Sequence, residues 1–194
     1  MNKQRVGHHP FRRDGVRPSI DGIRCLIQES PCFQAEEYVK VGIPYSGKTS
    51  FVATHEWLAK LPQVSLDREV MLLANGDYSY WEKCVPEASR RCEEYQEELI
   101  RTRQSFVIDK TNLVHTAREK LISRLRQSHY QIVAIVLDPP NPKTLKERVK
   151  KRKGQVVPKD VQKKMLDLFN ADKHWLLSEF DAVLYVSQTG EIHL

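Results

Sequence analysis

Residues 42–49 read GIPYSGKT, which satisfies the pattern G-x-x-x-x-G-K-[ST] of a phosphate-binding loop. A run rich in β-branched residues at 38–41 precedes this stretch, although it contains the charged Lys40. The segment 50–61, which has no Gly or Pro, follows it. This strand–loop–helix setting is what the motif requires, because loop amides and a helix N-terminus together cradle phosphate oxygens. We therefore predict a nucleotide-binding loop here, against the alternative of a plain glycine-containing turn.

The residues of this loop have separate expected roles. The Lys48 ammonium would neutralise the β- and γ-phosphates, and the Thr49 hydroxyl would ligate Mg²⁺. ATP and Mg²⁺ are accordingly the expected cofactors. Within the loop, the predicted nucleotide site comprises Gly42, Pro44, Tyr45, Ser46, Gly47, Lys48, Thr49 and Ser50.

Downstream of the loop, signals for strands and helices alternate. Strands are expected at 63–66, 105–109, 130–138 and 182–186, and helical patterns cover 86–101, 115–127, 144–153 and 158–171. Pro86 suits the first turn of its helix. The alternation predicts an α/β fold in which a parallel sheet is flanked by helices on both faces.

Two carboxylates fall at the ends of predicted strands. Asp67 follows the strand at 63–66, and Asp109 ends the strand at 105–109. Ligands of such sheets bind at the carboxyl ends of the strands, where the phosphate loop also lies. The two aspartates are therefore candidate site residues. The alternative for Asp67 is a helix N-cap for the segment DREVMLL at 67–73.

Length and composition suggest one domain with a tail. Of the 194 residues, 1–35 resemble a loosely ordered basic arm and 36–194 a single P-loop domain. No run of 18 apolar residues exists, and the N-terminus lacks the apolar core of a signal peptide, so we expect no membrane association. The four cysteines form no C-x-x-C pair, which favours reduced thiols over a zinc site.

Positive charge is concentrated in one stretch. The formal net charge is +6, and residues 143–164 contain ten Lys or Arg against Glu147 and Asp160. Such a run is compatible with a solvated helix face. It is also compatible with a basic helical lid that folds over phosphates, or with a surface that binds a nucleic-acid backbone.

The sequence resembles P-loop kinases of polynucleotide kinase type over about residues 38–186. The resemblance rests on GIPYSGKT (42–49), VSLD (64–67), FVIDKTNL (106–113) and LKERVKKRKGQVVPKDV (145–161). It implies a nucleotide-kinase-like P-loop NTPase with a basic helical lid. The implied activity is ATP-dependent phosphorylation of a nucleic-acid 5′-hydroxyl, with RNA or single-stranded DNA as partner.

The resemblance also implies roles for individual residues. Lys48 and Thr49 would engage the donor phosphates and the metal. Asp67 would be the general base, and Arg152 the lid arginine that neutralises the transferring phosphoryl group. Asp109 would lie near the donor and the metal.

Asn112 belongs to the same D-x-T-N element as Asp109. Two departures from the kinase pattern concern the acceptor side: Val70 stands where an arginine is often found, and Lys110 stands where the phage-type enzyme has its acidic residue.

The chain is also similar to the P-loop domain of heterogeneous nuclear ribonucleoprotein U and its paralogues. This likeness rests on residues 81–109, on FVIDKTN and LKERVKKR, and on FDAVLYV at 180–186. It implies a module that binds RNA and nucleotide without kinase activity. Asp67 favours the enzyme, because that family typically lacks a carboxylate there; a small-metabolite kinase is a third hypothesis, which the basic lid disfavours. We expect an intracellular protein, with the nucleus favoured over the cytoplasm.

Overall fold

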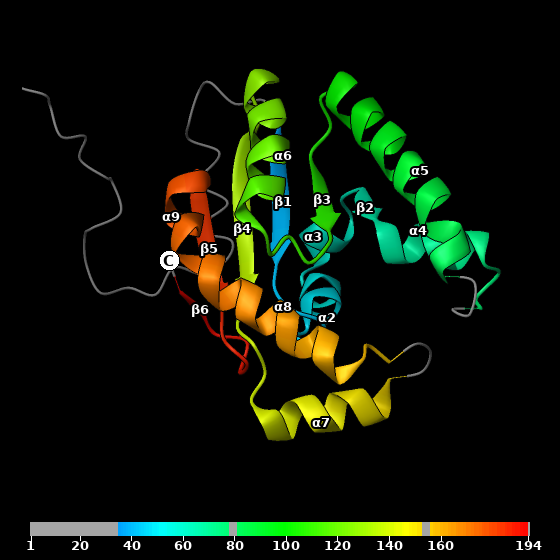
Figure 1. Ribbon diagram of the computed structural model, residues 1–194. Helices are drawn as coiled ribbons and strands as arrows, with labels where there is room; N and C mark the ends of the chain where they lie inside the picture. Colours follow the sequence, from blue (N-terminus) through cyan, green and yellow to red (C-terminus); the bar gives the residue numbers. More distant parts are fainter. Residues whose placement is uncertain (1–34, 78–80, 153–155, 194) are drawn as a thin grey trace, which may run out of the picture.

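The computed structural model describes residues 35–77, 81–152 and 156–193. The predicted arm at 1–35 lies outside them except for Ala35. Within the described residues, the centre is a six-stranded sheet in the order β2-β3-β1-β4-β5-β6 (Figure 1). The first five strands are parallel, and β6 pairs antiparallel with β5. The strands are β1 Glu36–Val41, β2 Gln63–Ser65, β3 Phe106–Asp109, β4 Gln131–Leu137, β5 Ala182–Val186 and β6 Ile192–His193.

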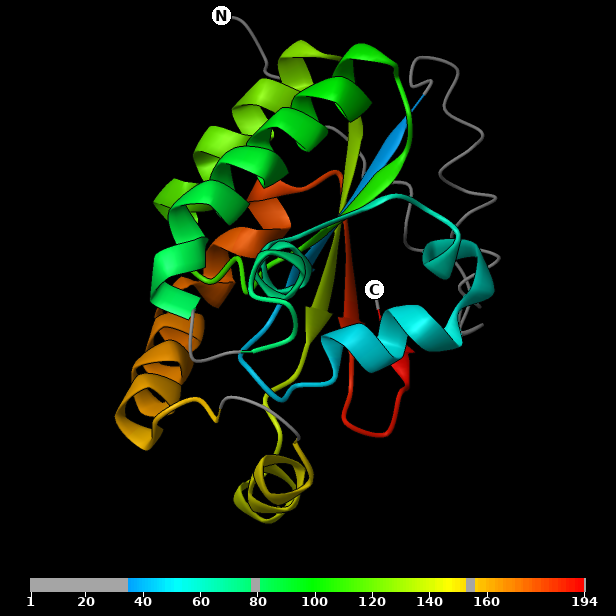
Figure 2. The same ribbon diagram turned by 90° about the vertical axis from the view of Figure 1, so that its right-hand side faces the viewer.

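Helices cover both faces of the sheet, as Figures 1 and 2 show. The described helices are α2 Lys48–Thr54, α3 Glu56–Ala59, α4 Leu66–Leu73, α5 Trp81–Arg101, α6 His115–Gln127, α7 Pro142–Lys151, α8 Lys159–Asp172, the 3₁₀ helix η2 Lys173–Trp175 and α9 Leu176–Glu179. Apolar residues of α5, α6, α8 and α9 pack on one face, and those of α2 and α3 pack on the other. The predicted fold class, a parallel sheet flanked by helices on both faces, is confirmed.

The burial of the central strands follows from this layering. Every residue of β4 (QIVAIVL) is buried, which explains its nearly continuous apolar sequence. Strand β1 is also buried after Glu36, and it carries two ionisable residues, Glu37 and Lys40, that are completely inaccessible to solvent. Burying a charge is costly unless it is paired, so these two residues need a physical explanation.

The topology creates a crevice beside the phosphate loop. The chain leaves β1 to form α2 on one face of the sheet, whereas it leaves the neighbouring β3 to form α6 on the opposite face (Figure 2). Adjacent strands whose connections diverge in this way leave room for a ligand at their carboxyl ends. The loops after β1 and β3 therefore frame the candidate site.

Two local predictions differ from the structure, and one strand was missed. The helix expected over 50–61 is divided at His55, which adopts an extended conformation while its Nδ1 lies 2.7 Å from the Phe51 carbonyl oxygen. Helix α5 begins at Trp81, so Pro86 lies inside the helix and not in its first turn. The short strand β6 was not predicted.

The segment around Asp67 also differs from expectation. Strand β2 ends at Ser65 and α4 begins at Leu66, so Asp67 lies in the first turn of a helix and not at the strand end. Ser65 is the N-cap, because its Oγ accepts from the Arg68 backbone N–H at 3.4 Å. The N-cap alternative for Asp67 is therefore wrong.

Candidate active site

The two glycines of the phosphate loop are required for different steric reasons. A Cβ at Gly42 would lie 2.9 Å from Ser46 Oγ and 3.1 Å from the Leu137 carbonyl oxygen, so no larger residue fits without displacing the loop. Gly47 has φ 103° where it caps α2, a conformation that side chains disfavour. Ser46 Oγ is buried and has no hydrogen-bond partner among the described residues. This tight loop has the shape of a phosphate cradle.

The Lys48 side chain folds back along the phosphate loop. Its Nζ donates to the carbonyl oxygens of Gly42 at 2.9 Å and of Ile43 at 2.8 Å. Burial lowers the pKa of Lys48 to about 8, although the nearby Asp109 carboxylate acts to raise it. The Lys48 charge is therefore held at the loop in a site where an added anion would interact strongly with it.

Asp109 forms an ion pair with the unexpected lysine of β1. Lys40 Nζ lies 2.6 Å from Asp109 Oδ1, and the side chains are 0% and 17% exposed, respectively. Burial lowers the pKa of Lys40, while Asp109 acts to raise it. The pair explains how a lysine is accommodated in a buried central strand.

Asp67 faces the same group of charges. Asp67 is exposed at the residue level, yet partial desolvation of its carboxylate raises its pKa, and the positive charge of Arg152 is the strongest opposing influence. Asp109, Lys48 and Lys40 also act on the pKa of Asp67. The structure thus gathers three predicted catalytic residues and one predicted metal ligand, together with Lys40, in a single electrostatic cluster.

Asn112 supports the loop after β3. Its Nδ2 donates to the Lys40 carbonyl oxygen at 2.8 Å, and the Gly42 N–H donates to the Thr111 carbonyl oxygen at 3.1 Å. From the other side, the buried Arg118 donates to the Asn112 carbonyl oxygen at 3.0 Å. Asn112 therefore ties the D-x-T-N loop to the start of the phosphate loop; its role toward the nucleotide stays a prediction.

The remaining predicted residues lie around this loop. Pro44 and Tyr45 are half-buried, and Thr49 and Ser50 are exposed in the first turn of α2. Val70, where the kinase pattern often has an arginine, is completely buried in the packing of α4. Core packing therefore accounts for the apolar side chain at that position.

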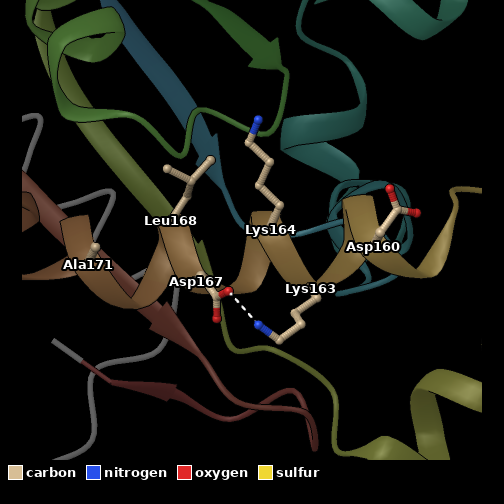
Figure 3. Close-up of a pocket in the computed structure, with 6 residues that line it drawn as sticks. All are labelled: Asp160, Lys163, Lys164, Asp167, Leu168 and Ala171. Atoms are coloured by element: carbon tan, nitrogen blue, oxygen red, sulfur yellow. Dashed lines mark hydrogen bonds and ion pairs between the residues drawn. The ribbon is translucent and has the colours of Figure 1, made fainter.

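The basic stretch separates into two different helices. Helix α7 has no buried residue and its basic side chains are opposed only by Glu147. In α8, the acidic residues Asp160, Asp167 and Asp172 balance the three lysines. A shallow cavity of about 430 Å³ lies along α8 (Figure 3). At this cavity, Lys163 Nζ lies 3.2 Å from Asp167 Oδ2, and the Lys164 side chain extends toward the loop after β3. The unbalanced positive charge therefore belongs to α7.

Two contacts with the loop come from residues that the sequence reasoning missed. Arg148 of α7 donates from Nη1 to the Tyr45 carbonyl oxygen at 2.7 Å, and Gln188 donates from Nε2 to the Ser46 carbonyl oxygen at 3.4 Å. Arg148 stands four residues before Arg152, so helical spacing was a signal that both arginines approach the same place. Nothing in the sequence around Gln188 indicated its contact.

A family model described as an AAA domain matches residues 38–172, which include the phosphate loop, Asp67, Asp109 and Arg152. The chain belongs to this AAA domain family. Together with the strand order and the loop geometry, the match defines a P-loop kinase-like domain. No curated protein gives a significant match to the AAA domain protein described here.

Solved structures share the fold at low sequence identity. A chain from the PezAT toxin–antitoxin system of Streptococcus pneumoniae has a TM-score of 0.64 and 13% identity, over 90% of this chain and 77% of that one. A chain of the Pnkp1/Rnl/Hen1 RNA repair complex has a TM-score of 0.58 and 21% identity, over 76% of this chain and 48% of that one. A sugar kinase from Janibacter sp. HTCC2649 has a TM-score of 0.52 and 20% identity, over 80% and 86%. None of these matches supports a ribonucleoprotein U-like module.

The residues at this edge of the sheet fit a nucleotide with Mg²⁺, which the P-loop kinase fold usually uses. The fit rests on the tight glycine loop, the Lys48 ammonium and the exposed Thr49 hydroxyl. Asp109 engages Lys40 through Oδ1, which leaves Oδ2 for the metal or for one of its waters. When bound, Mg²⁺ would offset the negative charge of the phosphate oxygens. Among the described residues, no three His, Cys, Asp or Glu side chains gather as an independent metal site.

Within the described part of the chain, no helix has the length and apolar character needed to cross a membrane.

Proposed function

We propose that this protein is an ATP- and Mg²⁺-dependent phosphotransferase that phosphorylates the 5′-hydroxyl end of a nucleic acid. The observation that carries the proposal is the electrostatic cluster at the carboxyl edge of the sheet. It sets Lys48, Arg152 and the carboxylate of Asp67 around one phosphate loop. Phosphoryl transfer depends mainly on positioning and on neutralising charge, and these groups supply both.

The proposed roles follow from the chemistry of each group. The acceptor oxygen forms a bond to the γ-phosphorus while the bond from that phosphorus to the β,γ-bridging oxygen breaks, so ADP leaves. Asp67 takes the proton of the acceptor hydroxyl, and Lys48 and Arg152 offset charge on the phosphoryl oxygens. Desolvation raises the pKa of Asp67, which strengthens it as a base.

Helix α7 supports a nucleic acid as the acceptor. It contains five basic residues and one acidic residue, and it stands clear of the sheet with no residue buried (Figure 1). An exposed cationic helix beside a phosphate loop suits a ligand that carries several phosphates of its own. The fold that this chain shares with the RNA repair complex chain is in keeping with that acceptor, although a sugar kinase shares it as well.

The test is transfer of the γ-phosphate from labelled ATP to a panel of acceptors. The panel holds RNA and DNA oligonucleotides with 5′-hydroxyl ends, the same oligonucleotides with 5′-phosphate ends, and small sugars. We expect label on 5′-hydroxyl oligonucleotides only. Label on sugars alone would identify a small-molecule kinase, and binding of RNA and ATP without label on any acceptor would identify a binding module.

A further inference from the structure

Tyr45 occupies an unusual place in the phosphate loop. Its φ of 66° lies in the left-handed region, where a bulky side chain is disfavoured and glycine is preferred. Strain of this kind persists only where surrounding contacts hold it, and it is concentrated at functional sites. The contacts of Tyr45 therefore indicate what the strain supports.

Three parts of Tyr45 contact residues at the end of α7 and before the start of α8. Its carbonyl oxygen accepts from Arg148 Nη1 at 2.7 Å, and its hydroxyl accepts from the Val157 N–H at 3.0 Å. The Arg152 guanidinium carbon lies 5.2 Å from the centre of the Tyr45 ring, within the range of a cation–π contact. One residue of the phosphate loop thus contacts the last turn of α7, the residue that follows α7, and the residue that precedes Pro158, the N-cap of α8.

These contacts matter because α7 has little else to hold it. No residue of α7 is buried, so its position does not follow from a share in the hydrophobic core. Arg148 also lies against the loop, 3.7 Å from the position that a Cβ at Gly47 would take. Arg152 acts electrostatically on both Lys48 and Asp67. The place of both lid arginines is therefore set by contacts with the loop itself.

We propose that Tyr45 is a positioning residue that docks α7 and the adjoining Arg152 on the phosphate loop, so that Arg148 and Arg152 stand beside the donor phosphates. This inference rests on the proposed function for its consequence in catalysis, but the docking itself does not. Tyr45 holds the arginines in place before the transferring phosphoryl group develops charge, which lowers the entropy lost in reaching the reactive arrangement.

The decisive variant is Tyr45→Gly, because glycine suits a φ of 66° and lacks the ring and the hydroxyl. We expect its melting temperature to equal or exceed that of the wild type, since strain is relieved. In the same protein without added nucleotide, the Arg152 and Val157 contacts are lost, although the backbone carbonyl still accepts from Arg148. Amide hydrogen exchange at Val157 and across α7 should therefore speed up about tenfold or more, the scale of losing a hydrogen bond and a cation–π contact. Exchange in α6, which does not touch Tyr45, is the internal control.

A second variant, Tyr45→Phe, keeps the ring over which Arg152 lies and removes only the acceptor for Val157. Its exchange rate should fall between those of wild type and Tyr45→Gly. In phosphoryl transfer, Tyr45→Gly should lower kcat much more than it changes the KM for ATP, and Tyr45→Phe should recover most of the loss.

The outcomes separate the two proposals. Unchanged exchange of α7 in Tyr45→Gly would overturn the docking role, as would a large fall in melting temperature together with wild-type behaviour of Tyr45→Phe. If α7 loosens in Tyr45→Gly while wild type transfers phosphate to no acceptor, the docking role stands and the proposed function fails.

Discussion

Lys40 and Asp109 form an ion pair across neighbouring strands, with Lys40 Nζ 2.6 Å from Asp109 Oδ1 and the lysine completely buried. Removing one partner of a buried ion pair leaves the charge of the other partner buried without a counter-ion. We predict that Lys40→Met lowers the free energy of unfolding by roughly 3 kcal/mol, as is usual for such pairs. Asp109→Asn in the Lys40→Met background should recover part of that loss, because no carboxylate is then left without a counter-ion. Urea unfolding of the two single variants and the double variant measures the coupling.

The chain contains a matched control for this prediction. Lys60 and Glu56 lie at the same 2.6 Å, but their side chains are 72% and 83% exposed. Lys60→Met should therefore change the free energy of unfolding by less than about 1 kcal/mol. Purely additive effects of Lys40→Met and Asp109→Asn would contradict a stabilising role for the buried pair.

The low pKa of Lys48 predicts a pH dependence of ATP binding. Only the charged ammonium makes a charge-assisted contact with phosphate, and burial lowers the Lys48 pKa to about 8. Above that pH the free protein has lost the proton, so binding must take one up and ATP affinity should fall as the pH rises from 7 to 9. Titration calorimetry in buffers of different ionisation enthalpy measures the uptake. Lys48→Arg, which keeps its charge over this range, should show no such uptake; equal uptake would exclude Lys48 as its source.

Glu37 predicts a pH dependence of stability that is independent of the site. Both of its carboxylate oxygens are buried without a hydrogen-bond partner among the described residues, and burial raises its pKa well above the usual value despite the opposing charge of Arg124. The folded protein thus keeps a proton that the unfolded chain releases above about pH 4.3. Stability contributed by this group is therefore present at low pH and lost as the pH rises toward the folded-state pKa.

In the Glu37→Gln variant, the side chain at this position stays neutral at every pH. Its free energy of unfolding, relative to that of the wild type, should increase between pH 5 and pH 8. Thermal unfolding across this range measures the difference, with the exposed Glu119→Gln as the control that should follow the wild type. A constant difference between Glu37→Gln and wild type would show that the Glu37 carboxyl does not titrate there.

The unbalanced charge of α7 predicts salt-dependent binding of RNA or single-stranded DNA. Replacing exposed Lys146, Lys150 and Lys151 by Ala should weaken binding at low salt, and each lost phosphate contact should reduce the log–log salt slope by about 0.7. Fluorescence anisotropy from low to moderate salt measures the slope. The control changes Lys60, Lys83 and Lys120 to Ala, an equal change in charge away from α7. Equal slopes for the two triple variants would indicate that α7 is an ordinary solvated helix that makes no specific contribution to nucleic-acid binding.

The fold was predictable because its signals are local and repeated. The apolar run at 130–138 matches β4 within one residue at each end, and 115–127 matches α6 at both ends. Strand β6 has only two residues, Ile192 and His193, which is too short for alternation to show. The break at His55 depends on a side-chain contact with Phe51, and sequence patterns do not show such contacts.

The site was predictable only where motifs record its chemistry. Lys48, Asp67 and Asp109 fall in recognisable patterns, and the structure brings them together. The sequence alone did not explain a lysine at position 40, because its ion-pair partner, Asp109, comes from a strand about seventy residues away. The contact of Arg148 with Tyr45 depends on how α7 docks, which no local pattern encodes.

The most direct test of the account is single-turnover transfer from labelled ATP to a 5′-hydroxyl RNA by wild type, Asp67→Asn and Glu69→Gln. Asp67 and Glu69 are both acidic residues of the first turn of α4, so each substitution removes one carboxylate from the same helix end. We predict a fall of about 10²-fold for Asp67→Asn, the scale of losing a general base, with ATP affinity and melting temperature nearly unchanged and Glu69→Gln close to wild type. Transfer by Asp67→Asn at the wild-type rate, or no transfer by wild type to any nucleic-acid end, would contradict the account.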